Sequence, residues 1–290
     1  MSAPFGQLQW LRACYRALPH LGLFALLIAA WEVLVRTGVI ASIMVPRPSS
    51  IGASIVELYF VKGTIWRHFF ITLGEAVGGF LIGAAIAVAL AIGSSLWEPF
   101  RRYVSPYAVV LNVTPGIALT PIIIAWFGFG MGSKMALAAI ISFFPIFVNT
   151  LTGLTQPDTE REELFRSLGS SERQVFWMLR VPSALPLMFA GFKIGLTTAL
   201  IGAVVAEFAQ ATEGVGVLMS RFSFQLNMGA SIATLLSMTL IGLILFYSME
   251  FLDDRTVFWR REERRAAASR NRARAWKRYA KLNSKSGSSI

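Results

Sequence analysis

Residues 156–182 read QPDTEREELFRSLGSSERQVFWMLRVP and form a polar segment between two long apolar stretches of the chain. Thr159 and Glu162 have the spacing of a capping box, which predicts that a helix begins there. Two further glutamates place negative charge at the helix start, where the helix dipole favours it. Gly169 predicts the end of this helix, because glycine readily takes the left-handed conformation that ends many helices.

A second short helix is expected directly after the glycine. Ser171 with Gln174 can cap a helix over residues 172–180, which we expect to end before Pro182 because proline cannot donate the next backbone hydrogen bond. Apolar residues give this elbow (residues 156–182) an apolar side: Leu164, Phe165, Leu168, Val175, Phe176 and Met178. A loop facing only solvent would not need such a side, so we expect it to dock a partner or to rest against the membrane domain.

The composition is that of an integral membrane protein. Of the 290 residues, 55% are hydrophobic and only 15% are charged, and the mean hydropathy is +0.59. A helix needs about 20 apolar residues to cross a bilayer. Six such spans are predicted, at roughly 20–40, 69–92, 103–127, 135–155, 183–207 and 231–252. We therefore expect an all-α polytopic membrane protein with a segment 1–19, a six-helix domain 20–252 containing the elbow, and a basic tail 253–290.

The distribution of Lys and Arg predicts the orientation. With the N-terminus inside, the inner loops and ends hold 20 of the 27 Lys and Arg residues, and the outer loops hold six. Without the tail the ratio is 8 to 6, which still favours both termini and the elbow in the cytoplasm. A cleaved signal peptide at the first span is the alternative, but the apolar character continues past Ala30, and cleavage would leave an odd number of spans.

The third and fourth spans carry polar and helix-breaking residues. Asn112, Thr114 and Pro115 interrupt the third span, and Asn149 lies in the fourth. Lipid cannot satisfy such groups, so we expect them to be buried in protein or to line a wet translocation path. Glycines at four-residue spacing in the second span allow close helix contact, either within one subunit or between subunits.

Ionisable residues inside the spans are candidates for function, although structural roles are equally open. Glu75, Lys193 and Glu207 lie in or near apolar spans, and Glu207 is added to the predicted path. The segment ending at Lys134 resembles a phosphate-binding loop, but Ser133 stands where that motif needs glycine, so a turn is the better interpretation. With two histidines and one cysteine in the chain, no metal site, no cofactor and no catalytic residue are expected.

The tail from residue 253 onward carries 12 Lys and Arg against four acidic residues. Basic charge next to a span is expected to bind anionic lipid headgroups, with docking of a partner protein as the alternative. We expect no role in nucleic-acid binding.

At the elbow the chain resembles the membrane subunits of ABC importers. Their cytoplasmic signature reads Glu-Ala-Ala, then glycine four residues after the second alanine, then Ile-x-Leu-Pro beginning ten residues after that glycine. Glu163-Leu164-Phe165, Gly169 and Leu179-Arg180-Val181-Pro182 stand at these three places with matching spacing, although both alanines, the isoleucine and the leucine are replaced. Further motifs look like the subgroup that takes up nitrate, sulfonates, taurine, thiamine pyrimidine or riboflavin: Leu185-Pro186, Val204-Val205-Ala206-Glu207, Glu213-Gly214-Val215-Gly216, Trp126-Phe127-Gly128 and Phe143-Phe144-Pro145.

The resemblance implies a type I importer permease in a bacterial cytoplasmic (inner) membrane. Its partners would be a second copy of the chain, two cytoplasmic ATPase subunits and an extracytoplasmic binding protein that delivers a small solute. ATP would be hydrolysed on the separate ATPase. The elbow would contact that ATPase through Glu160, Glu162, Glu163, Leu164, Phe165, Gly169 and Pro182. Two other classes remain: a secondary transporter or channel without an ATPase, and a membrane enzyme or assembly scaffold, for which the catalytic residues are missing. The sequence does not identify the solute.

Overall fold

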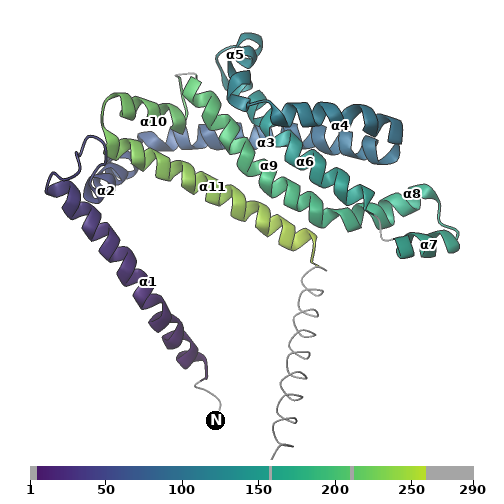
Figure 1. The fold of residues 1–290 in the computed structure, drawn as a ribbon, viewed down its shortest axis with the longest axis horizontal. Helices are drawn as coiled ribbons and strands as arrows, with labels where there is room; N and C mark the ends of the chain where they lie inside the picture. Colours follow the sequence, from purple (N-terminus) through teal and green to yellow (C-terminus); the bar gives the residue numbers. More distant parts are fainter. Residues whose placement is uncertain (1–4, 157–158, 210–211, 259–290) are drawn as a thin grey trace, which may run out of the picture. The chain divides into compact units, whose positions relative to one another are not determined.

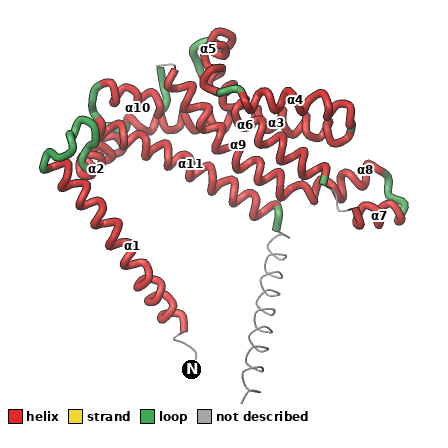
Figure 2. The backbone as a smooth tube through the Cα atoms, in the orientation of Figure 1, coloured by secondary structure: helices red, strands yellow, loops and turns green. Residues whose placement is uncertain are grey.

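The computed structural model describes residues 5–156, 159–209 and 212–258, and within these ranges the chain is helical with short connections (Figures 1 and 2). The helices in chain order are α1 Phe5–Arg36, α2 Pro48–Val56, the π-helix η1 Glu57–Val61, α3 Thr64–Leu96, α4 Glu98–Val113, α5 Gly116–Phe127, α6 Met131–Thr155, α7 Thr159–Ser167, α8 Glu172–Val175, the π-helix η2 Phe176–Arg180, α9 Val181–Ala209, α10 Val215–Phe224 and α11 Met228–Thr256. The all-α fold class predicted from the sequence is confirmed.

The number of membrane spans is confirmed only in part. Four stretches of the described chain are long and apolar enough to cross a membrane: α3, α6, the continuous helix Glu172–Ala209, and α11. The pair α4 and α5 gives a fifth if it counts as one broken span. The first predicted span falls on α1, which does not meet the same test, so the count of six is not reproduced.

The predicted third span is broken in two. α4 ends at Val113 and α5 begins at Gly116, and the two helices differ in direction by 102°. Thr114 and Pro115 both have extended backbone conformations there, and Thr114 does so because a residue before proline is driven out of the helical region. The predicted interruption therefore falls at Pro115, whereas Pro121 lies inside α5 and Pro145 inside α6.

The chain divides into two compact units, and the first comprises residues 1–74 and 204–241. In this unit Glu32 of α1 accepts hydrogen bonds from the backbone N–H and the hydroxyl of Ser49, at 3.0 and 2.8 Å, and so fixes the start of α2. The Tyr59 hydroxyl donates to Ser237 Oγ of α11 at 2.8 Å. These two contacts tie α2 and η1 to α1 and α11.

The described part of the second unit lies within residues 75–203 and 242–258 and contains the two helices of the elbow. Here α3 and α6 pack closely at small residues: a side chain on Gly79 would lie 2.7 Å from the Met135 carbonyl oxygen, and one on Gly83 would lie 2.6 Å from that of Ala139. α9 lies along the same α6, as Figure 1 shows, with Gly153 of α6 against Ala184 of α9. These glycines thus serve helix packing within the chain, one of the two alternatives left open by their spacing.

The boundary predicted for the tail lies inside a helix. α11 runs to Thr256, so Asp253 and Asp254 belong to it, and Val257 is buried just beyond its end. The remainder of the predicted tail, residues 259–290, lies outside the described residues.

Candidate functional site

The elbow consists of two helices, as the sequence predicted, and the first of them ends where expected. α7 ends in a Schellman motif at Gly169, whose φ is +79°. The Gly169 N–H donates to the Arg166 carbonyl at 3.0 Å, and the Ser170 N–H donates to the Phe165 carbonyl at 3.1 Å. A side chain at position 169 would meet no neighbour within 4 Å, so the need for glycine is conformational and not steric.

The second helix begins as predicted but does not end where expected. Ser171 and Gln174 form a complete capping box. The chain then continues without a break through η2 into α9, so the expected end before Pro182 is wrong. The Val181 N–H reaches back five residues to the Phe176 carbonyl, and this wider turn gives the Pro182 ring room that a regular α-helix would deny it.

Two ion pairs hold α7 against the second helix. Arg180 donates to both carboxylate oxygens of Glu162, at 2.5 and 3.3 Å, and both side chains are largely buried. Arg166 lies 2.8 Å from Glu172, but this pair is exposed and contributes little. Glu162 is bonded to Arg180, so its position supports a bracing role within the elbow. Its neighbours Glu160 and Glu163 are exposed.

The apolar side of the elbow separates into two parts. Phe176 is 5% exposed and joins a core with Leu154 of α6 and Ala184 of α9, while Val175 is fully buried. Leu164 and Leu168 are 57% and 76% exposed, and Phe165 is partly buried. Burial of one aromatic side chain is worth about 2 kcal/mol. The elbow is therefore anchored to α6 and α9 on one side and presents leucines on the other.

The residues of the predicted path lie at different places in the fold. Asn112 is exposed near the end of α4, and Thr114 donates its hydroxyl to the Val110 carbonyl at 2.8 Å. Gly116, next to Pro115, packs against Ile141 of α6. Asn149 lies eight residues further along α6, roughly 12 Å by helix rise, where its amide donates to the Pro145 carbonyl at 2.8 Å. A path lined by all of these residues stays a prediction.

Glu207 lies in the first unit, at the centre of a buried hydrogen-bond network. Its carboxylate is 1% exposed and accepts from the Thr72 hydroxyl at 2.5 Å and from the Gly216 N–H at 2.6 Å. Thr72 Oγ1 in turn accepts from the Val215 N–H at 2.9 Å. Gly214, the residue before Val215, donates its N–H to His68 Nδ1 at 2.9 Å. These bonds hold the loop before α10 against the start of α3, and the role of Glu207 in a path stays a prediction.

The other two ionisable residues in the spans have charged partners. Lys134 Nζ lies 2.8 Å from Glu75 Oε1, with both side chains at most 3% exposed. Lys193 Nζ lies 2.7 Å from Asp253 Oδ2 of α11. The sequence placed Lys134 in an outer turn and did not pair it with Glu75. Glu75 inside an apolar span was the available signal, but only the packing of α3 on α6 identifies Lys134 as its partner.

Within the described ranges no three His, Cys, Asp or Glu side chains gather as metal ligands do. The features that do occur are apolar spans, a broken span and a braced elbow at the joint of two spans. They define a polytopic helical membrane protein whose elbow is braced by an ion pair and anchored in the core.

The comparisons with known proteins identify the family. Residues 79–258 match the model of the binding-protein-dependent transport system inner membrane component, and the chain belongs to this family. It is 33% identical over 257 residues to the formylaminopyrimidine transport permease protein ThiX of Halalkalibacterium halodurans, covering 87% of this chain and 100% of that protein. It is 33% identical over 195 residues to the putative aliphatic sulfonates transport permease protein SsuC of Bacillus subtilis, covering 67% and 70% of the two chains.

A solved structure shares the fold. A chain of the inward-facing MetNI methionine ABC transporter superposes with a TM-score of 0.56 at 19% identity, covering 68% of this chain and 97% of that one. The chain is thus an ABC importer permease with a type I fold, in the subgroup that the motifs predicted. It is a transport subunit and not an enzyme, and in this family the ATPase is a separate subunit.

Proposed function

We propose that two copies of this chain form the translocation path of an ATP-driven importer, with two ATPase subunits at the elbows and an extracytoplasmic binding protein on the opposite side. Family membership supports the class of partners. In this proposal both termini and the elbow are cytoplasmic, as the distribution of Lys and Arg predicts.

The observation that carries the proposal is the rigid elbow. Gly169 fixes the turn, Phe176 anchors the second helix in the core, and the Glu162–Arg180 pair braces α7 against it. A push on α7 by a closing ATPase would pass into α9 through one continuous helix, and Pro182 lies at the joint. Leu164 and Leu168, with Phe165 beside them and Glu160 and Glu163 at the rim, would form the contact surface.

The solute is proposed as a small organic molecule or a small inorganic anion. Relatives are named for formylaminopyrimidine, aliphatic sulfonates, taurine and riboflavin transport, so we propose a sulfonate, taurine, nitrate or vitamin-precursor class for this chain. Uptake of each labelled solute by cells carrying the complete transporter, against cells lacking this chain, distinguishes these classes.

A variant at the turn tests the elbow. Gly169→Val forces a β-branched residue into a left-handed backbone conformation, so the turn should distort while the spans still insert. We expect ATPase co-purification and solute uptake to fall together, at unchanged membrane content. Gly132→Val, at a glycine in the first turn of α6 that is not left-handed and has open space around it, is the matched control. Normal uptake by Gly169→Val would contradict the proposal that the elbow passes the movement of the ATPase to α9. ATP-independent uptake by the chain alone would favour a secondary transporter.

A further inference from the structure

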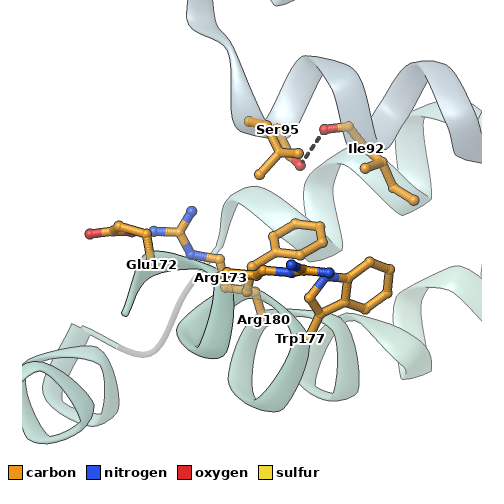
Figure 3. A pocket seen from close by; sticks show the side chains of 8 residues that line it. Ile92, Ser95, Glu172, Arg173, Trp177 and Arg180 are labelled. Atoms are coloured by element: carbon orange, nitrogen blue, oxygen red, sulfur yellow. Dashed lines mark hydrogen bonds between the residues drawn. The ribbon is translucent and has the colours of Figure 1, made fainter. Parts of the chain in front are cut away.

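A groove of about 540 Å³ lies between the end of α3 and the elbow, within the second unit. Ile92, Ser95 and Leu96 line it from α3, at the three- and four-residue spacing of one helix face. The opposite wall belongs to the second helix of the elbow and is lined by Glu172, Arg173, Phe176, Trp177 and Arg180. Figure 3 shows the labelled side chains of the two walls on either side of this groove. The volume lies within the range of small-molecule binding pockets.

Both walls of the groove carry apolar side chains. Ile92 and Leu96 of α3 face Phe176 and Trp177 of the second helix. Ser95 adds no free donor, because its hydroxyl donates to the Ile92 carbonyl at 2.8 Å. Leu96 and Trp177 are 61% and 55% exposed, although they are large and apolar. An apolar wall left open in this way needs an apolar occupant or a lipid environment.

The charges favour an anionic occupant. Arg180 is engaged with Glu162, and Glu172 is engaged with Arg166, so these groups are already balanced. Arg173 is exposed, and within the described part of the chain it has no hydrogen-bond or ion-pair partner. The groove therefore offers one uncompensated guanidinium, a group that binds phosphate oxygens through paired N–H donors.

The location favours a lipid as the source of that anion. The groove opens where the apolar helix α3 ends, beside Trp97, which is 62% exposed. Tryptophans in such places lie at the headgroup level of the bilayer. A basic segment of this chain, such as its own tail, would meet like charge at Arg173.

We propose that this groove binds one anionic phospholipid, whose phosphate contacts Arg173 and whose acyl chain lies along Leu96 and Trp177. This site is separate from the basic tail, and the binding of lipid there does not depend on the proposed function. Only the placement of the groove at the inner leaflet rests on the proposed function, which puts the elbow in the cytoplasm. A bound lipid would fill the space between α3 and the elbow. It would therefore restrict movement of the second helix, to which α7 is tied.

The test uses the full-length chain in vesicles of phosphatidylcholine that contain increasing fractions of brominated phosphatidylglycerol or brominated phosphatidylcholine. Bromine quenches nearby tryptophan fluorescence, and the difference between the chain and its Trp177→Phe variant isolates Trp177 from the other tryptophans. We expect half-maximal quenching of Trp177 at an about fivefold lower fraction of brominated phosphatidylglycerol than of brominated phosphatidylcholine, as one well-placed Arg implies. Excess soluble glycerol phosphate should not relieve it.

Arg173→Gln should abolish this preference. Arg102→Gln should keep it, because Arg102 is an exposed arginine at the start of α4 that does not line the groove. Equal quenching by both lipids, an unchanged preference in Arg173→Gln, or relief by glycerol phosphate would overturn the lipid site. Loss of quenching on adding the ATPase subunit would instead assign the groove to that protein and would also overturn it. Co-purification of the ATPase, measured on the same variants, reports on the proposed function separately.

Discussion

Lys134 Nζ of α6 lies 2.8 Å from Glu75 Oε1 of α3, and both side chains are almost completely buried. The pair lies beside the close contact of Gly79 with α6. Removing one charge of a buried pair leaves the other without compensation, which costs about 3–5 kcal/mol, whereas replacing both with apolar groups is often neutral. The pair therefore ties two helices together and makes their packing depend on both charges.

Lys134→Met should destabilise the chain by about 3–5 kcal/mol, and the double variant Glu75→Leu/Lys134→Met should recover most of that loss. Thermal unfolding in detergent, followed by size-exclusion chromatography, measures both. Lys62→Met is the control, because Lys62 pairs with Glu57 at 2.6 Å in an exposed position and should cost at most about 1 kcal/mol. A double variant as unstable as the single one would show that the charges do not act as a pair.

The elbow brace makes a second prediction. Glu162→Gln removes a charged hydrogen-bond acceptor from Arg180, at a cost of about 1.5–3 kcal/mol to the elbow. Solute-stimulated ATP hydrolysis by the reconstituted transporter should fall, while the amount of assembled complex stays close to normal. Arg166→Gln breaks the exposed pair with Glu172 and should have a much smaller effect. Equal hydrolysis by the two variants would assign no bracing role to Glu162.

Local signals predicted the start of the elbow well. Ser171 with Gln174, and Gly169 before them, act within one helical turn, so their effect is readable from spacing alone. Pro182 gave the wrong helix end because a π-helical turn, which nothing in the spacing signals, lets the helix continue.

Partnerships between distant residues could not be predicted. Glu207 and Gly216 were recognised as parts of two separate motifs, yet they form one hydrogen bond of 2.6 Å. A side chain at position 216 would lie 2.7 Å from Glu207 Oε2, which explains the glycine. Such pairs depend on how α10 folds back after α9, and hydropathy carries no information on that.

Variants at Glu207 separate a structural role from a path role. Glu207→Ala would leave Thr72 and the Gly216 N–H without their buried acceptor, so we expect a loss of about 2–3 kcal/mol in stability. Gly216→Ala should destabilise in the same direction, because the added methyl group crowds the carboxylate. Unfolding curves measured beside uptake decide the matter: a fully stable Glu207→Ala chain that fails to transport would support the path.

Accessibility measurements test the rest of the path. Single cysteines at positions 112, 114 and 149, in a Cys14→Ser background, should react with water-soluble thiol reagents at rates that change with the nucleotide state. Asn149 should respond most, because it lies on α6 against Gly191 of α9, the helix that continues from the elbow. Residue 148, next to it and exposed, serves as a position on another face of α6. Unchanging rates at all three positions would remove them from the path.

Truncation tests the tail, and the structure sets where to cut. A stop after Arg255 would remove Val257, which is 2% exposed, so the stop belongs after Phe258. The removed residues 259–290 carry eleven Lys and Arg against two Glu, a net charge of +9. Each basic residue near the bilayer contributes about 1 kcal/mol of attraction to anionic lipid, within a Debye length of about 8 Å at physiological salt. We expect the truncated complex to retain less anionic lipid while solute-stimulated ATP hydrolysis stays mostly intact, since the elbow is unchanged. Both are measured in the same anionic vesicles at low and high salt, and an assembled truncated complex without hydrolysis would show instead that the tail supports the ATPase directly.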